Sequence, residues 1–111
     1  MKVRFEGPIL FLDDKSWKLD HAIRDAFELG GKAIVLFEPD EVMNTFGQFH
    51  NLVAIDGDGT RTWEAELPTT ITGDRYYKVV RRIPLVAYSV QSYDCQIDPA
   101  TGRIVDRTFT K

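Results

Sequence analysis

Asn51-Leu-Val-Ala-Ile-Asp-Gly-Asp-Gly-Thr-Arg-Thr-Trp-Glu-Ala-Glu-Leu67 is the stretch that decides the fold class, because an apolar run meets an alternating run across Asp-Gly-Asp-Gly. Trp63, Ala65 and Leu67 fall on one face of the second run, which is the period of two of a half-buried strand. The first run, residues 52–55, is apolar at every position. We therefore expect it inside a sheet and covered on both faces. Together the two runs predict a β-hairpin.

A second hairpin of the same kind contains the turn Ile97-Asp-Pro-Ala-Thr-Gly102. Both turns place an aspartate after an isoleucine and a glycine before the outgoing strand, and Asp56 and Asp98 lie 42 residues apart. That interval suits a four-stranded unit such as a propeller blade, although a closed β-propeller needs about four or more blades. We therefore expect an antiparallel β-meander of about seven or eight strands, propeller-blade-like and curled into a sandwich or partly closed barrel.

Alternation and turn residues mark the remaining elements. Further strands are predicted over residues 2–5, 9–12, 32–37, 75–83, 85–90, 93–97 and 103–110. Residues 38–50 predict an irregular loop, and we expect its Met43, Phe46 and Phe49 to fold back over the core.

Residues 19–29 fit two different elements. Their apolar side chains recur with the spacing of an amphipathic helix, which Gly30-Gly31 would end. Ile23, Phe27 and Leu29 also alternate, and the same two glycines lead into residues 32–37 as a hairpin partner. The alternative to an all-β fold is therefore α+β with one helix near residues 19–29.

The run Asn51–Gly59 followed by Trp63 resembles the outer hairpin of quinoprotein-type propeller blades, in which a short apolar strand, an aspartate-glycine turn and a tryptophan recur. With the second hairpin and the ending at residues 104–111, the chain is also similar to small uncharacterised bacterial β-proteins. The resemblance implies a strand pair over residues 23–37, so we expect an all-β fold. It implies no cofactor, because nothing in the motif ligates a quinone.

Length and composition indicate one domain spanning residues 1–111. The net charge of −3 argues against nucleic acid as a partner, since a polyanion is usually met by a basic surface. No run approaches the ~18 apolar residues that cross a bilayer, so no membrane is expected. The N-terminal residues show no signal peptide, and Cys95 is the only cysteine. We therefore expect a cytoplasmic location.

The spacing of Asp56, Asp58 and Thr60 matches the first three ligands of a calcium loop, but Arg61 stands where the loop needs glycine. The two histidines have no carboxylate neighbour at ligand spacing. No metal site is predicted, and the aspartates are explained by their tolerance of turn conformations.

Catalytic patterns are also missing from the sequence. Glu64 and Glu66 project from one strand face about 7 Å apart, a separation that inverting glycosidases use, but a flat sheet provides no sugar cleft between them. Cys95 shares a strand face with Tyr93 and Ile97, so we expect a buried thiol rather than a nucleophile. The sequence therefore predicts no enzyme.

Aromatic residues are the candidates for recognition, namely Trp17, Tyr76 and Tyr77. Because Tyr76 and Tyr77 are adjacent in a predicted strand, they must point to opposite faces, and one of them should be exposed. The first functional hypothesis is a non-enzymatic domain that binds another protein, in a specific version a toxin-immunity protein. The alternatives are a small ligand-binding β-barrel or enzyme with a site built from scattered residues, and a module that forms homo-oligomers through an exposed strand.

Overall fold

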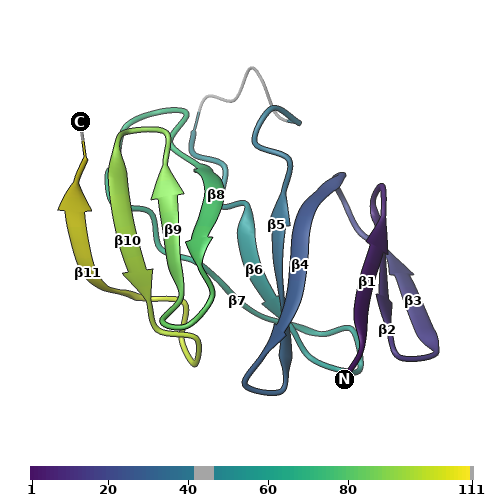
Figure 1. Ribbon diagram of the computed structural model, residues 1–111. Coiled ribbons are helices and arrows are strands. Elements are labelled where there is room, and N and C mark those ends of the chain that lie inside the picture. The colour runs from purple at the N-terminus through teal and green to yellow at the C-terminus, as the bar shows by residue number, and fades with distance from the viewer. Residues whose placement is uncertain (42–46, 111) are drawn as a thin grey trace.

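The computed structural model describes residues 1–41 and 47–110. This described part contains eleven strands and no helix (Figure 1). The strands are β1 (Val3–Glu6), β2 (Ile9–Leu12), β3 (Lys15–Lys18), β4 (Ile23–Leu29), β5 (Lys32–Phe37), β6 (Leu52–Ile55), β7 (Arg61–Glu64), β8 (Tyr76–Arg81), β9 (Val86–Ser89), β10 (Tyr93–Ile97) and β11 (Ile104–Phe109). The all-β expectation is confirmed, and nothing in this part could cross a bilayer as a long apolar helix.

The strands form three antiparallel sheets, with the orders β1-β2-β3, β4-β5-β6-β7 and β11-β10-β9-β8. We call them the N-terminal, middle and C-terminal sheets. They are packed in a row, with the middle sheet between the C-terminal sheet on the left and the N-terminal sheet on the right (Figure 1). The prediction of seven or eight strands in one meander is wrong, because the described residues hold eleven strands in three sheets. None of these sheets closes into a barrel.

The middle sheet is buried on both faces, which gives the molecule two core clusters. Ile34, Leu36, Leu52 and Ala54 pack toward the C-terminal sheet. Ala33, Val35, Val53 and Ile55 pack toward the N-terminal sheet. All of them are at most 1% exposed. Burial on both faces explains the uninterrupted apolar runs, as predicted for residues 52–55.

The helix predicted as the alternative for residues 19–29 is wrong, since residues 23–29 form β4. This strand also lies in the middle sheet, so its two faces are both apolar: Ile23 and Ala26 face one core cluster, and Phe27 and Leu29 face the other. A register shift between Ile23 and Asp25 breaks the simple alternation. Because both faces of β4 are covered and the bulge shifts the alternation, its apolar residues recur with the spacing of an amphipathic helix.

Strand β3 was not predicted, because residues 13–16 have the composition of a turn. Asp13, with a φ of +54°, makes the turn instead, and Lys15 already pairs with Leu12. In the loop that follows β5, Phe49 packs against the core between the N-terminal and middle sheets. Met43 and Phe46, predicted to fold back in the same way, lie outside the described residues.

Each pair of neighbouring sheets is joined by a tryptophan side chain that packs on a glycine of the next sheet. Trp17 of β3 covers Gly59, and Trp63 of β7 covers Gly102; a Cβ built on either glycine would lie 2.5 or 2.6 Å from the indole. Both glycines have positive φ, +88° and +77°, in turns that join the third and fourth strands of their sheets. The 42-residue interval of the two hairpins thus corresponds to the same position in two successive four-stranded sheets.

Asn51 joins the middle and C-terminal sheets by hydrogen bonds. Its side-chain amide donates to the carbonyl oxygens of Phe37 at 3.1 Å and Tyr76 at 2.7 Å, and its Oδ1 accepts the N–H of Tyr76 at 2.8 Å. Asn51 is fully buried. A buried amide that satisfies three backbone groups fixes where β8 begins relative to the end of β5.

Candidate functional site

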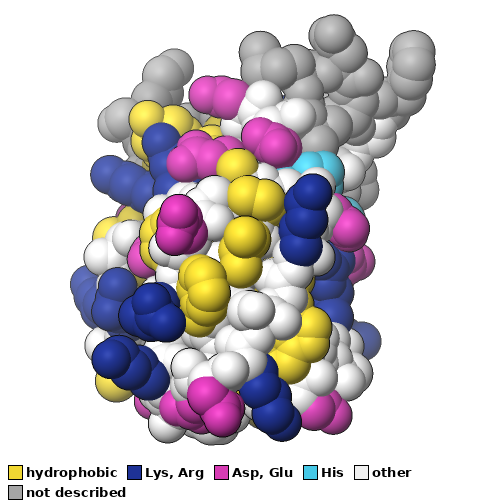
Figure 2. All heavy atoms as spheres, turned by 90° about the vertical axis from the view of Figure 1, so that its right-hand side faces the viewer, with side chains coloured by type: hydrophobic (Ala, Val, Ile, Leu, Met, Phe, Trp, Pro, Cys, Tyr) yellow, Lys and Arg dark blue, Asp and Glu magenta, His cyan; other side chains and the backbone are white. Residues whose placement is uncertain are grey.

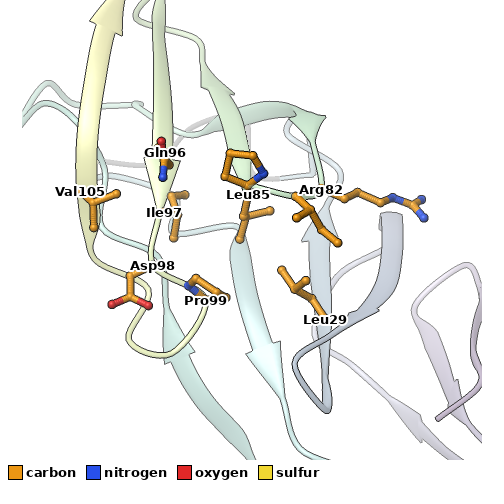
Figure 3. Close-up of a pocket in the computed structure, with 10 residues that line it drawn as sticks. Leu29, Arg82, Leu85, Gln96, Ile97, Asp98, Pro99 and Val105 are labelled. Carbon is orange, nitrogen blue, oxygen red and sulfur yellow. The ribbon is translucent and has the colours of Figure 1, made fainter.

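An apolar cavity of about 340 Å³ lies between the middle and C-terminal sheets, at the end where the β4–β5, β8–β9 and β10–β11 turns meet (Figure 3). Segments far apart in the sequence contribute to it. It is lined by Leu29, Ile83, Pro84, Leu85, Ile97 and Pro99 together with Val105, Gln96, Arg82 and Asp98.

The base of the cavity belongs to the core. Leu85 and Ile97 are 2% and 1% exposed, and the N–H of Ile97 donates to the carbonyl oxygen of Leu85 at 2.9 Å. Leu29, at the end of β4, comes from the opposite sheet and points toward them (Figure 3). Because both sheets contribute, the cavity depends on the packing of one sheet against the other.

The wall made by Pro99 is held by two hydrogen bonds. The indole Nε1 of Trp63 donates to the carbonyl oxygen of Pro99 at 2.9 Å. The N–H of Gly102 donates to the carbonyl oxygen of Asp98 at 2.8 Å, which closes the turn. The tryptophan that covers Gly102 therefore also positions one side of the cavity.

The rim of the cavity is apolar and exposed. Ile83 is 78% exposed and Val105 is 58% exposed, the two largest values among the exposed large hydrophobic side chains that the structure describes. Both lie at the mouth of the hollow whose base is fully buried. An aliphatic side chain of a partner could fill this space and cover both residues.

Two charged side chains lie on opposite sides of the cavity, Arg82 next to the middle sheet and Asp98 on the β10–β11 turn (Figure 3). The Arg82 guanidinium lies 4.4 Å from the centre of the Phe27 ring and 3.6 Å from the Asp25 carboxylate. Asp98 accepts the N–H of Ala100 at 2.9 Å. Apolar walls with a small number of charged groups at the rim are typical of a site that binds a ligand or a partner.

The three residues predicted for recognition lie in three different environments, and none lines the cavity. Tyr76 is fully buried, and its hydroxyl donates to the carbonyl oxygen of Glu66 at 2.6 Å. Burial raises the pKa of Tyr76 well above its ordinary value. Trp17 is half-buried against Gly59. A partner could reach the Tyr76 ring only if the core opened.

Tyr77 is 45% exposed, so the prediction that the adjacent tyrosines point to opposite faces is confirmed. The Arg24 guanidinium lies 4.6 Å from the centre of the Tyr77 ring and donates to the Tyr77 carbonyl oxygen at 2.7 Å. Sequence reasoning missed Ile83 and Val105. The sequence placed Ile83 at the end of the strand predicted over residues 75–83, whereas β8 ends at Arg81 and leaves Ile83 in the turn before Pro84.

The carboxylates of Glu64 and Glu66 have structural partners. Glu64 pairs with the Arg61 guanidinium at 2.8 Å, and Glu66 accepts the N–H of Ile104 at 2.9 Å. Glu66 also borders a second, polar hollow together with Asp106 and Arg107. Glu66 thereby joins the end of the middle sheet to the start of β11.

The aspartates of the first hairpin act as turn residues. Asp58 Oδ1 accepts the N–H of Thr60 at 3.0 Å, and this hydrogen bond lowers the pKa of Asp58. In residues 1–41 and 47–110, no group of three or more histidine, cysteine, aspartate or glutamate side chains is placed to hold a metal ion.

The outer face of the N-terminal sheet is a further candidate surface. Figure 2 shows a short row of hydrophobic side chains on this side, bordered by both basic and acidic side chains. Ile9 and Phe11 of β2 are half-buried, and the Arg4 guanidinium lies 4.7 Å from the centre of the Phe11 ring. Since this row is already partly covered by its own neighbours, the cavity is the stronger candidate.

The Cys95 thiol is fully buried, and burial raises its pKa from 9.0 to about 11. Two pKa units reduce the thiolate fraction at pH 8 by about 100-fold. We expect iodoacetamide to alkylate Cys95 at least ~100-fold more slowly in the folded protein than in urea. Equal rates would contradict the buried placement. Ser16→Cys in a Cys95→Ser background, at an exposed position of β3, provides the fast-reacting control.

Comparison of the sequence with known protein families identifies the family of this chain. Residues 1–109 match the family described as "Domain of unknown function (DUF7957)". The chain belongs to this family. No curated protein and no solved structure matches it. The DUF7957 match runs from before β1 to the end of β11, so the family region includes all three sheets and the cavity.

Proposed function

We propose that this chain is a non-enzymatic, cytoplasmic domain that acts by binding another protein. The observation that carries the proposal is the apolar cavity, with Ile83 78% exposed at its mouth. Removing apolar surface from water is favourable by about 25 cal/mol per Å². The free energy therefore falls when a partner covers the hollow and the exposed aliphatic side chain beside it. Interfaces concentrate their binding energy at such anchors.

The exposed hydrophobic side chains favour the C-terminal sheet. Of the nine exposed large hydrophobic residues in the part of the chain that the structure describes, six belong to this sheet or its turns, namely Tyr77, Val80, Ile83, Val90, Val105 and Phe109. Ile83 and Val105 lie at the cavity, and a pair of neighbouring exposed apolar residues marks an interaction surface better than an isolated one does. Tyr77, a candidate from the sequence, lies in the same sheet but at the start of β8, away from the β8–β9 turn that lines the cavity.

A toxin-immunity protein is the specific form of this function that small size and acidity predict. It requires a tight partner that binds one to one. The exposed charges around the cavity, Arg82 and Asp98, would contribute mainly to the choice and orientation of that partner.

The proposal is tested by affinity capture with tagged protein from the lysate of its source, followed by mass spectrometry. We expect one stoichiometric polypeptide on the wild-type column, and at least a tenfold lower yield with Ile83→Asp, because a carboxylate at the mouth of the cavity would have to be desolvated. Ile71→Asp is the matched control. Ile71 is 51% exposed and lies before β8, whereas Ile83 follows it.

Both substitutions change an exposed isoleucine, so the two variants should melt within about 2 °C of the wild type. A column that retains no polypeptide at physiological salt would overturn the proposal. Equal capture by wild type and Ile83→Asp would show that a partner binds elsewhere.

A further inference from the structure

The apolar cavity and its most exposed rim residue form a knob beside a hole. Ile83 projects into solvent at 78% exposure, and it borders the hollow whose base is formed by Leu85 and Ile97. A two-fold symmetric contact joins the same patch on two molecules, so that residue i of one copy meets residue j of the other and the reverse. If Ile83 of each copy enters the cavity of the other, the same contact forms twice in one interface.

We propose that the occupant of the cavity is a second copy of this chain, with Ile83 of each copy seated in the cavity of the other. The inference rests on the proposed function and names its partner. Such a pair also covers Val105, so it removes from water the two most exposed large hydrophobic residues that the structure describes. Burial of this kind is the main favourable contribution to association.

The charges at the rim have the arrangement that a two-fold pair needs. Arg82 and Asp98 lie on opposite sides of the cavity, and both side chains extend outward from it (Figure 3). A two-fold axis that lies in the plane of the contact, perpendicular to the line between Arg82 and Asp98, brings Arg82 of one copy toward Asp98 of the other, twice. The Arg82 side chain is 59% exposed and its contact with Asp25 is long, at 3.6 Å, so the guanidinium can donate to a second carboxylate. Opposite charges placed in this way fix the orientation of the pair.

The exposed edge of β11 is a weaker place for self-association. The Glu66 carboxylate already accepts the N–H of Ile104, and the Arg107 guanidinium donates to the carbonyl oxygen of Pro68. The chain that follows β7 therefore covers part of this edge. A strand from a second copy would have to displace these contacts before it could pair with β11.

The test is sedimentation equilibrium of the full chain over a dilution series. We expect a monomer–dimer equilibrium with a Kd of about 1 to 100 µM, the range of weak, reversible association. Ile83→Asp should weaken dimerisation at least tenfold, and Ile71→Asp should leave it unchanged. A monomer at every concentration would overturn the inference, and so would a dimer that Ile83→Asp leaves intact.

The charge pair is tested by a double-substitution cycle. Arg82→Gln and Asp98→Asn should each raise Kd by about threefold, and the double variant should lose less than the product of the two, because the same contact is removed. Asn at position 98 keeps a side-chain oxygen for the N–H of Ala100. Fully multiplicative losses would contradict the predicted Arg82–Asp98 contact.

The outcomes separate this inference from the proposed function. A monomeric protein that captures a different polypeptide through Ile83 supports the proposed function and rules out the second copy as the occupant. A dimer that Ile83→Asp dissociates, on a column that captures nothing else, supports the second copy and removes the need for a different partner.

Discussion

Gly102→Ala is expected to destabilise the protein by about 3 kcal/mol and to lower its Tm by about 13 °C. Gly102 has a φ of +77°, a conformation that is unfavourable by about 1 to 2 kcal/mol for residues with a Cβ. The new Cβ would also lie 2.6 Å from Cε3 of Trp63, which forces the indole to move. Because the same indole holds Pro99, the cavity should widen. Thermal and urea unfolding measure the effect.

Gly30→Ala is the control that separates the strain of a positive φ from the clash with Trp63. Gly30 has a φ of +60°, but nothing lies within 4 Å of a Cβ built there. We expect it to lose only the conformational part, about 1 kcal/mol. If Gly102→Ala and Gly30→Ala destabilise the protein equally, the packing of Trp63 on Gly102 does not hold the two sheets together.

Asn51→Leu is expected to destabilise the protein by about 4 kcal/mol, because each backbone group left buried without a partner is unfavourable by about 1 to 3 kcal/mol. The substitution removes the hydrogen bonds to the carbonyl oxygens of Phe37 and Tyr76 and to the N–H of Tyr76. Urea unfolding gives the size of the loss. Amide hydrogen exchange shows where the stability is lost, since the Tyr76 amide should exchange much faster in the variant.

Gln48→Leu is the control for Asn51→Leu. The Gln48 amide also donates to two carbonyl oxygens, those of Thr69 and Ile71, but Gln48 is only half-buried. Water can replace its hydrogen bonds, so we expect a loss below about 1 kcal/mol. A similar loss in both variants would contradict the special position of Asn51 between the sheets.

The sequence predicted elements better than it predicted their assembly. The apolar run at residues 52–55 and the two aspartate-glycine turns are local signals, and each was found where it was expected. Strand β3 was missed because its first two residues, Lys15 and Ser16, belong to a run with the composition of a turn, and only Trp17 of its four residues is apolar. The number of sheets could not be inferred, because alternation shows that a strand has a buried face but not which sheet covers it.

The candidate site was harder to predict for the same reason. Ile83 and Pro99 come from two turns of the C-terminal sheet, and Leu29, at the end of β4, meets them only when the middle sheet stacks on that sheet. Nothing in their spacing along the chain indicates a common cavity. The prediction of Trp17 as a recognition residue followed from its aromatic character alone, whereas its indole is the contact surface for Gly59.

Amide chemical-shift mapping over a dilution series of the full chain shows which surface this protein uses to bind a second copy. The account predicts that the amides of Leu29, Ile83, Leu85 and Val105 shift with concentration, and that those of Arg4 and Ser16 on the far side of the N-terminal sheet do not. Shifts confined to the N-terminal sheet or to the β11 edge, with none around the cavity, would contradict it.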